Sequence, residues 1–198
     1  MSNSNSERPS TLLSWVFDVL EMFAWAMFVV LILFTFAFRL CRTEGGSMEN
    51  TLNNGDVLLL YSLGYEPEQD DIVVFHLTDS ATEKTLVKRV IATGGQKIVI
   101  NFATCEIYVD GVLYADSHAV LKDRITDREL GFYTLTANHH YDPATRTLTA
   151  TVPEGQVFVL GDNRNNSKDS RSDEIGFVDE RCILGKVFCR LLPFTKFD

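Results

Sequence analysis

The stretch Leu86-Val87-Lys88-Arg89-Val90-Ile91 places one basic pair inside a run of apolar residues. Its composition is typical of a β-strand with at least one buried face. Short runs of the same kind, separated by turn-forming residues, follow one another from residue 55 onward. They cover residues 56–61, 71–76, 97–100, 107–109, 132–136, 147–152, 156–160 and 184–191.

No long helical periodicity interrupts these runs. Asp142-Pro143 lies between two of them and predicts a turn that joins hairpin strands. Residues 112–131 carry mixed charge with little pattern, which predicts an excursion on the surface. We therefore expect an all-β fold whose antiparallel strands form a sandwich or a partly closed barrel.

The N-terminal part of the chain is built differently. Residues 23–38 are 16 residues without a charge, and apolar residues before them lengthen the run enough for a membrane-spanning helix. A buried core helix is the first alternative, but the run lacks a polar face and the rest of the chain is built of β-type runs. The bulky residues 38–40 argue against both a removable signal peptide and a lipid-modified Cys41. We expect a polar tail over residues 1–11, a transmembrane anchor over 12–40 and a folded domain over 41–198.

The composition excludes one class of partner. The net charge is −9, and an acidic surface repels phosphate backbones, so we expect no nucleic-acid binding.

None of the four cysteines has the spacing of a zinc or redox motif, and we expect no metal and no cofactor. Small buried thiols are the simplest interpretation, although Cys182 and Cys189 could be bridged in an oxidising space.

Lys88 and Ser47 are candidates for nucleophilic chemistry. Burial lowers the pKa of a lysine by as much as 3–5 units, so a buried Lys88 could act as base to a serine. Alternatively, Lys88 and Arg89 both extend their charges to solvent. Ser47 follows two glycines, which either expose a nucleophile or form a plain linker. It lies seven residues past Leu40, within roughly 25 Å of the end of the anchor.

Residues 161–171, Gly-Asp-Asn-Arg-Asn-Asn-Ser-Lys-Asp-Ser-Arg, follow an apolar strand and are dense in turn formers and opposite charges. They form either a solvated loop or a network of side-chain hydrogen bonds.

These segments together resemble bacterial type I signal peptidases over nearly the whole chain. That family has an N-terminal anchor and then Ser-Met-x-Pro-Thr-Leu, Gly-Asp-Ile-Val-Val-type, Lys-Arg-Val-Ile and Gly-Asp-Asn-Arg-x-x-Ser-x-Asp-Ser-Arg segments. The last is matched in full by residues 161–171, and the lysine segment by residues 88–91. The resemblance implies a membrane-bound serine endopeptidase that cleaves signal peptides from exported preproteins, with its catalytic domain on the extracytoplasmic side.

The resemblance also implies a role for individual residues. Ser47 is similar to the family's nucleophile and Lys88 to its general base, while Ser167 resembles the serine that orients the lysine. The backbone N–H of Ser47 would supply one oxyanion donor. Two ion pairs would hold the surrounding loop, namely Asp169 with Arg171 and Asp162 with Arg89. The expected substrates carry small residues, above all alanine, at the first and third positions before the cut.

The chain also departs from the family pattern. Asn50 replaces the usual proline, so we expect a less rigid loop after Ser47. Asp70 replaces a glycine, and residues 92–96 lack the family's Gly-x-Pro-Gly-Asp continuation. Gly45 stands where some members carry a hydroxyl residue that completes the oxyanion hole, so the second oxyanion donor stays open.

Three other interpretations compete with this one. A non-enzymatic relative that assists assembly of surface proteins or pili would lack the lysine, which is present here. A self-cleaving repressor-type protease would carry a DNA-binding domain in place of the apolar segment. A histidine-based or metal site would need partners for His139 and His140, and we expect both to be solvated loop residues.

Overall fold

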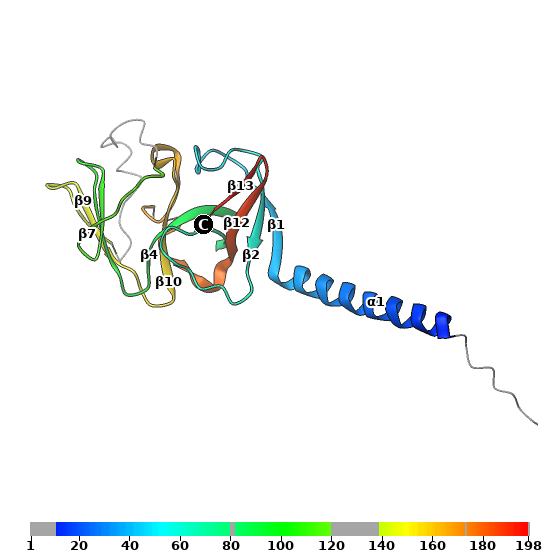
Figure 1. Ribbon diagram of the computed structural model, residues 1–198. Coiled ribbons are helices and arrows are strands. Elements are labelled where there is room, and N and C mark those ends of the chain that lie inside the picture. Colours follow the sequence, from blue (N-terminus) through cyan, green and yellow to red (C-terminus); the bar gives the residue numbers. More distant parts are fainter. Residues whose placement is uncertain (1–10, 80–81, 120–138, 173, 198) are drawn as a thin grey trace, which may run out of the picture.

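The computed structural model describes residues 11–79, 82–119, 139–172 and 174–197, in which one long helix precedes two β-sheets (Figure 1). The helix α1 (Thr11–Ala37) leads directly into the first strand. Two short 3-10 helices, η1 (Arg164–Asn166) and η2 (Glu180–Cys182), lie in the connections near the C-terminus.

The first sheet has eight strands, which pair antiparallel in the order β1-β2-β12-β3-β4-β10-β11, with β13 beside β12. Neighbours in this sheet come from distant parts of the sequence, since β12 lies between β2 and β3. Its strands are β1 (Phe38–Arg42), β2 (Val57–Tyr61), β3 (Ile72–Asp79), β4 (Thr82–Thr93), β10 (Gln156–Leu160), β11 (Val178–Asp179), β12 (Ile183–Leu192) and β13 (Phe194–Lys196).

The second sheet has five antiparallel strands in the order β7-β6-β5-β9-β8. It follows β4 in the chain and returns to the first sheet through β10. Its strands are β5 (Lys97–Asn101), β6 (Glu106–Val109), β7 (Val112–Leu113), β8 (His139–Asp142) and β9 (Thr147–Thr151).

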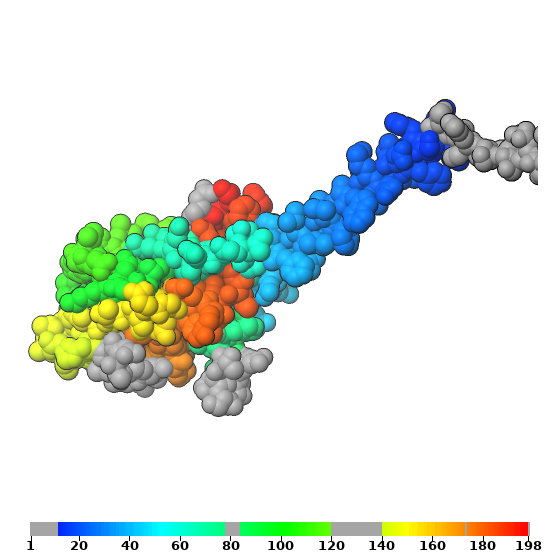
Figure 2. All heavy atoms as spheres, turned by 90° about the horizontal axis from the view of Figure 1, so that it is seen from below, coloured from blue at the N-terminus to red at the C-terminus, as the bar shows by residue number. Residues whose placement is uncertain are grey.

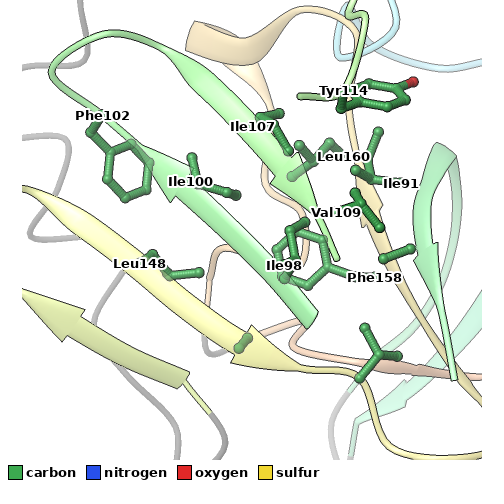
Figure 3. Close-up of a cluster of buried hydrophobic side chains, with 13 residues drawn as sticks. Ile91, Ile98, Ile100, Phe102, Ile107, Val109, Tyr114, Leu148, Phe158 and Leu160 are labelled. Atoms are coloured by element: carbon green, nitrogen blue, oxygen red, sulfur yellow. The ribbon is translucent and has the colours of Figure 1, made fainter. Parts of the chain in front are cut away.

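One cluster of buried side chains joins the two sheets (Figure 3). Ile98 and Leu148 come from the second sheet and Phe158 from the first, and all three are fully buried. Burying a side chain of this size stabilises a fold by about 1.5–3 kcal/mol. The cluster therefore fixes β4 and β10, the strands that lead into the segments of chemical interest.

A second cluster fills the space beneath β1, β2 and β12 and includes residues from the loop after β1. Met48 and Leu52 of this loop are 4% and 1% exposed and pack against Leu58 and Leu60 of β2. The residue immediately after Ser47 is thus part of the core, which holds the serine in place although it lies in a loop.

The helix α1 makes little contact with the body and projects from it (Figure 2). The stretch Leu12–Ala37 has a mean hydropathy of 2.3, and of its residues only Ala37, the last, is buried, so it is long and apolar enough to cross a membrane. Phe38 continues the chain into β1 and packs its ring against Phe34 of the helix and Tyr61 of β2, at centroid distances of 5.3 and 5.8 Å.

The predicted all-β class with antiparallel strands and one N-terminal apolar helix is confirmed, and the sheets do not close into a barrel. The turn at Asp142-Pro143 is confirmed between β8 and β9. The predicted strand at 132–136 lies outside the described residues, as does most of the excursion at 112–131, whose first residues form β7.

The expectation that His139 and His140 are loop residues was wrong. They begin β8, because pairing with Ala150 and Thr149 gives their backbone a strand partner. All four cysteines lie among the described residues and are free thiols.

Candidate active site

Ser47 lies in the loop between β1 and β2, which is closed at its base by backbone hydrogen bonds. Thr43 N–H donates to Asp56 O and Gly55 N–H donates to Thr43 O, both at 2.9 Å. Within the loop, Leu52 N–H donates to Met48 O at 2.8 Å. These bonds and the buried Met48 leave Ser47 half-buried at the edge of a cleft.

Lys88 of β4 reaches this serine, which is 41 residues away in the sequence. Its side chain is buried, and Nζ donates to Ser47 Oγ at 2.8 Å and to Val87 O at 2.9 Å. Burial lowers the pKa of Lys88 to about 8, with smaller opposing effects from nearby charges: Asp169 and Asp162 raise it and Arg171 lowers it. Among the described residues, no carboxylate lies within ion-pair distance of Nζ. The lysine is thus poised to lose its proton far more readily than a solvated one.

Arg89, the next residue, points to the opposite side of β4, as expected for consecutive strand residues. It is also buried, and it forms a bidentate pair with Asp162, in which Nε and Nη2 donate at 2.9 and 2.8 Å. Asp162 Oδ2 also accepts from Thr51 Oγ1 at 2.5 Å. Asp162 therefore ties the lysine-bearing strand to the loop that carries Ser47.

The segment 161–171 has its own ion pair at the centre. The carboxylate of Asp169 is fully buried and accepts from Arg171 Nε and Nη2 at 2.7 and 2.9 Å and from Gly161 N–H at 3.0 Å. Burial alone would raise the pKa of Asp169, but the Arg171 guanidinium and these hydrogen bonds hold it below its usual range. Arg164 of the same segment pairs with Asp116, with Nη2 to Oδ1 at 2.9 Å. The segment is therefore a network of side-chain hydrogen bonds and not a solvated loop.

Ser167 does not contact Lys88 by a hydrogen bond in this structure. Its Oγ is buried and has no partner of acceptable hydrogen-bond geometry among the described residues, although it lies close enough to lower the pKa of Asp169. A Cβ added to Gly161 would lie 2.1 Å from Ser167 Oγ and 2.5 Å from Ser47 O. Ser167 thus packs close to the nucleophile loop, and only a glycine at position 161 leaves room for this contact.

Asn163 is a residue that sequence reasoning did not single out. Its backbone N–H donates to Ser47 O at 3.0 Å, and its side-chain Nδ2 donates to Gly46 O at 2.9 Å and to Glu49 Oε2 at 3.2 Å. It belongs to the segment 161–171, but nothing in the sequence indicates that its partners lie more than a hundred residues earlier. Asp116 and Thr51 were missed for the same reason.

A cleft of about 610 Å³ lies beside Ser47 and Lys88. One wall comes from residues 41–45 and the other from residues 84–88 of β4. In the described part of the chain, β10 pairs with β4 only from Arg89 onward, so residues 82–88 of β4 have one unpaired edge. An unpaired edge beside a cleft can accept an extended peptide as an added strand.

The structure thus brings Ser47 and Lys88 together and pairs Asp162 with Arg89 and Asp169 with Arg171. Gly45 offers no side chain to the site, and its N–H donates to Asn54 Oδ1 at 3.1 Å. No second oxyanion donor is evident at that position.

Comparisons with known proteins agree on one family. A family model described as signal peptidase, peptidase S26, matches residues 16–192. Signal peptidase IB of Staphylococcus aureus strain Mu50 is 31% identical over 189 residues, which cover 94% of this chain and 92% of the relative. A probable signal peptidase I-1 of Synechocystis is 33% identical over 159 residues, covering 76% and 69%. A crystal structure of a signal peptidase I from Enterococcus faecalis V583 has 27% identity and a TM-score of 0.41, covering 62% of this chain and 97% of that one.

We expect Gly161→Ala to lower the free energy of unfolding by about 1–3 kcal/mol, because its Cβ would displace both Ser167 and the Ser47 carbonyl. Denaturant unfolding measures this change. Asn166→Ala, at an exposed position of the same segment, is the control and should change stability by less than about 0.5 kcal/mol. A Gly161→Ala variant as stable as the parent would contradict the packing described here.

Proposed function

This chain belongs to the signal peptidase family of serine peptidases, peptidase S26, and we propose that it removes N-terminal signal peptides from exported preproteins by a Ser-Lys dyad mechanism. One observation carries the proposal. The buried Lys88 Nζ lies 2.8 Å from Ser47 Oγ, which is the distance needed for direct proton transfer between base and nucleophile.

In the proposed reaction, neutral Lys88 accepts the proton of Ser47 as Oγ attacks the carbonyl carbon of the residue before the cut. A tetrahedral intermediate forms, and protonated Lys88 returns the proton to the leaving amine as the peptide bond breaks. Water then attacks the acyl-enzyme with Lys88 again as base, and the proton passes to Ser47 Oγ as the ester bond breaks and the carboxylic acid product leaves. The lowered pKa supports this role, since with a pKa of about 8 roughly a tenth of the lysine is neutral at pH 7.

The two ion pairs support the base indirectly. Asp162 and Asp169 are each engaged by an arginine, and neither carboxylate hydrogen-bonds Lys88. A direct carboxylate partner would favour the charged lysine and raise its pKa. Ser167 is proposed, by resemblance to the family, to orient the lysine during turnover.

The substrate is proposed to bind as an extended strand along the unpaired edge of β4, with its residues before the cut directed at the cleft. Leu86 and Val87 of β4 and Met48 and Leu52 of the nucleophile loop supply apolar atoms to the lining of this cleft. Such a lining suits small apolar residues at the first and third positions before the cut.

The helix α1 is proposed to span the membrane once, with the catalytic domain on the extracytoplasmic side. Strand pairing aligns Phe38, Tyr61, Lys186, Val73 and Lys88 in one row across the sheet. Phe38 directly follows the helix, and four strand spacings of about 4.8 Å set Lys88 roughly 20 Å away along that row. The dyad therefore lies roughly 20 Å from the end of the anchor, which supports cleavage near the membrane surface.

We expect Ser47→Ala and Lys88→Ala each to lower the rate of preprotein cleavage at least about a thousandfold, because the nucleophile and its base act as a unit. Cleavage of a purified preprotein by the detergent-solubilised full chain measures the rate. Lys168→Ala, which removes an exposed lysine paired with Glu174, is the control and should retain activity. Retained activity in either dyad variant would overturn the assignment.

We expect kcat/KM to rise with pH through about 8 and to level off above it. The base must be neutral to accept a proton, so the neutral fraction of Lys88 sets the rising limb. The rate profile between pH 6 and 10 tests this. A rate independent of pH across that range would argue against Lys88 as the titrating base.

In intact cells, we expect protease added from outside, after permeabilisation of any outer barrier, to digest residues beyond the anchor. A cytoplasmic protein that stays undigested in the same sample is the control. A body protected until the cell membrane is broken would place it in the cytoplasm, and the export role would fail.

A further inference from the structure

The peptide unit between Gly46 and Ser47 carries the backbone N–H that would stabilise the oxyanion. We propose that Asn163 is a positioning residue that aims this N–H at the oxyanion by holding the carbonyl of the same peptide unit. The inference rests on the proposed function and extends it to a residue outside the Ser-Lys dyad.

Three hydrogen bonds connect Asn163 to the nucleophile loop, and two of them are accepted by the carbonyls of Gly46 and Ser47. Nδ2 donates to Gly46 O at 2.9 Å, and the backbone N–H donates to Ser47 O at 3.0 Å. The carbonyls before and after the nucleophile are therefore both held by one residue. Asn163 is only 2% exposed, so water cannot readily compete for these bonds.

The planarity of the peptide bond makes the first of these contacts directional. In a trans peptide, the C=O and N–H point in opposite directions within one plane, so fixing Gly46 O also fixes the direction of Ser47 N–H. A hydrogen bond accepted by the carbonyl also polarises the peptide unit and strengthens its N–H as a donor. Asn163 thus acts on the oxyanion site from the far side of the peptide.

Glu49 helps to set the side-chain amide of Asn163. Its Oε2 accepts from the same Nδ2 at 3.2 Å, and both neighbours of that nitrogen are acceptors, which determines the orientation of the amide. Asn163 Oδ1 is buried and has no partner among the described residues. Leaving a buried carbonyl oxygen without a hydrogen bond costs free energy. The side-chain amide of Asn163 nevertheless keeps this orientation, in which its nitrogen donates to the nucleophile loop.

The Glu49 carboxylate also explains why position 46, directly before the nucleophile, is a glycine. A Cβ on Gly46 would lie 2.7 Å from Glu49 Oε1, so any larger residue would push Glu49 away from Asn163. At Gly45, meanwhile, the N–H is already used by Asn54 and there is no side chain. With no donor from Gly45, the aim of Ser47 N–H matters more to the proposed reaction.

The test is Asn163→Ala in the full-length chain, with kcat and KM measured on a preprotein. Loss of a whole oxyanion donor costs about 10²–10³ in kcat, so misdirecting one should lower kcat about 10- to 100-fold with KM within about threefold. A peptide aldehyde, whose adduct with the serine carries an oxyanion, should lose affinity by a similar factor. A non-cleavable peptide analogue of the substrate should bind as before.

Asn163→Leu, which is close to asparagine in shape but cannot donate, provides the same test if the alanine variant does not fold. Glu49→Ala should cost less than either, because Nδ2 still reaches Gly46 O. Asn166→Ala is the matched control in the same segment. A folded Asn163 variant with parental kcat would overturn the inference, as would equal losses for the aldehyde and the non-cleavable peptide.

Failure of this inference is distinguishable from failure of the proposed function. If the parent cleaves preproteins and Ser47→Ala does not, the function stands whatever Asn163 does. The Ser47 amide ¹⁵N chemical shift gives a readout without activity, since loss of the hydrogen bond at Gly46 O should move it. An unchanged shift in Asn163→Leu would show that the contact does not polarise this peptide and would overturn the inference.

Discussion

A lysine side chain that is held in the interior, with no carboxylate partner among the described residues, is the constraint on which the site depends. Moving an ammonium out of water is costly, and a protein can lower that cost by letting the group lose its proton. Lys88 is 2% exposed, its pKa falls to about 8, and Ser47 Oγ accepts its hydrogen bond. The proposed chemistry uses the neutral form that burial favours, so the energetic cost and the catalytic role have the same origin.

The other buried charges around this lysine are arranged as pairs. Arg89 with Asp162 and Arg171 with Asp169 form short, bidentate contacts in the interior. Removing one partner of such a pair leaves an uncompensated charge and typically costs about 3–5 kcal/mol. Because Asp162 also holds Thr51, the first pair connects β4, the nucleophile loop and the segment 161–171. Charge pairing thus sets the positions of three segments that are distant in sequence.

Apolar packing also holds the nucleophile loop in position. Met48 and Leu52 anchor the nucleophile loop in the core, and Gly161 allows Ser167 and the Ser47 carbonyl to approach closely. The departure at Asn50, where the family has proline, does not leave this loop unsupported. Buried apolar residues and the contacts from Asn163 restrain it from two sides.

The sequence by itself determined eight of the strands (β2 to β6, β9, β10 and β12), the apolar helix and the residue types of the site. These depend on local backbone preferences and on the partition of side chains between water and the interior, and both are visible in the order of residues. Strand alternation also predicts that Lys88 and Arg89 face opposite sides. The family resemblance identified Ser47 and Lys88 as the dyad, but the sequence around them does not give the distance between the two side chains.

Only the tertiary structure decided the contacts between distant segments. The 2.8 Å contact between Lys88 and Ser47, the pKa of that lysine and the reach of Asn163 to Gly46 all depend on how two sheets and one loop pack together. Ser167 packs beside the loop without bonding the lysine, and His139 gains a strand partner, for the same reason. Burial and hydrogen bonding are sums over neighbours from the whole chain, and no local stretch of sequence contains those neighbours.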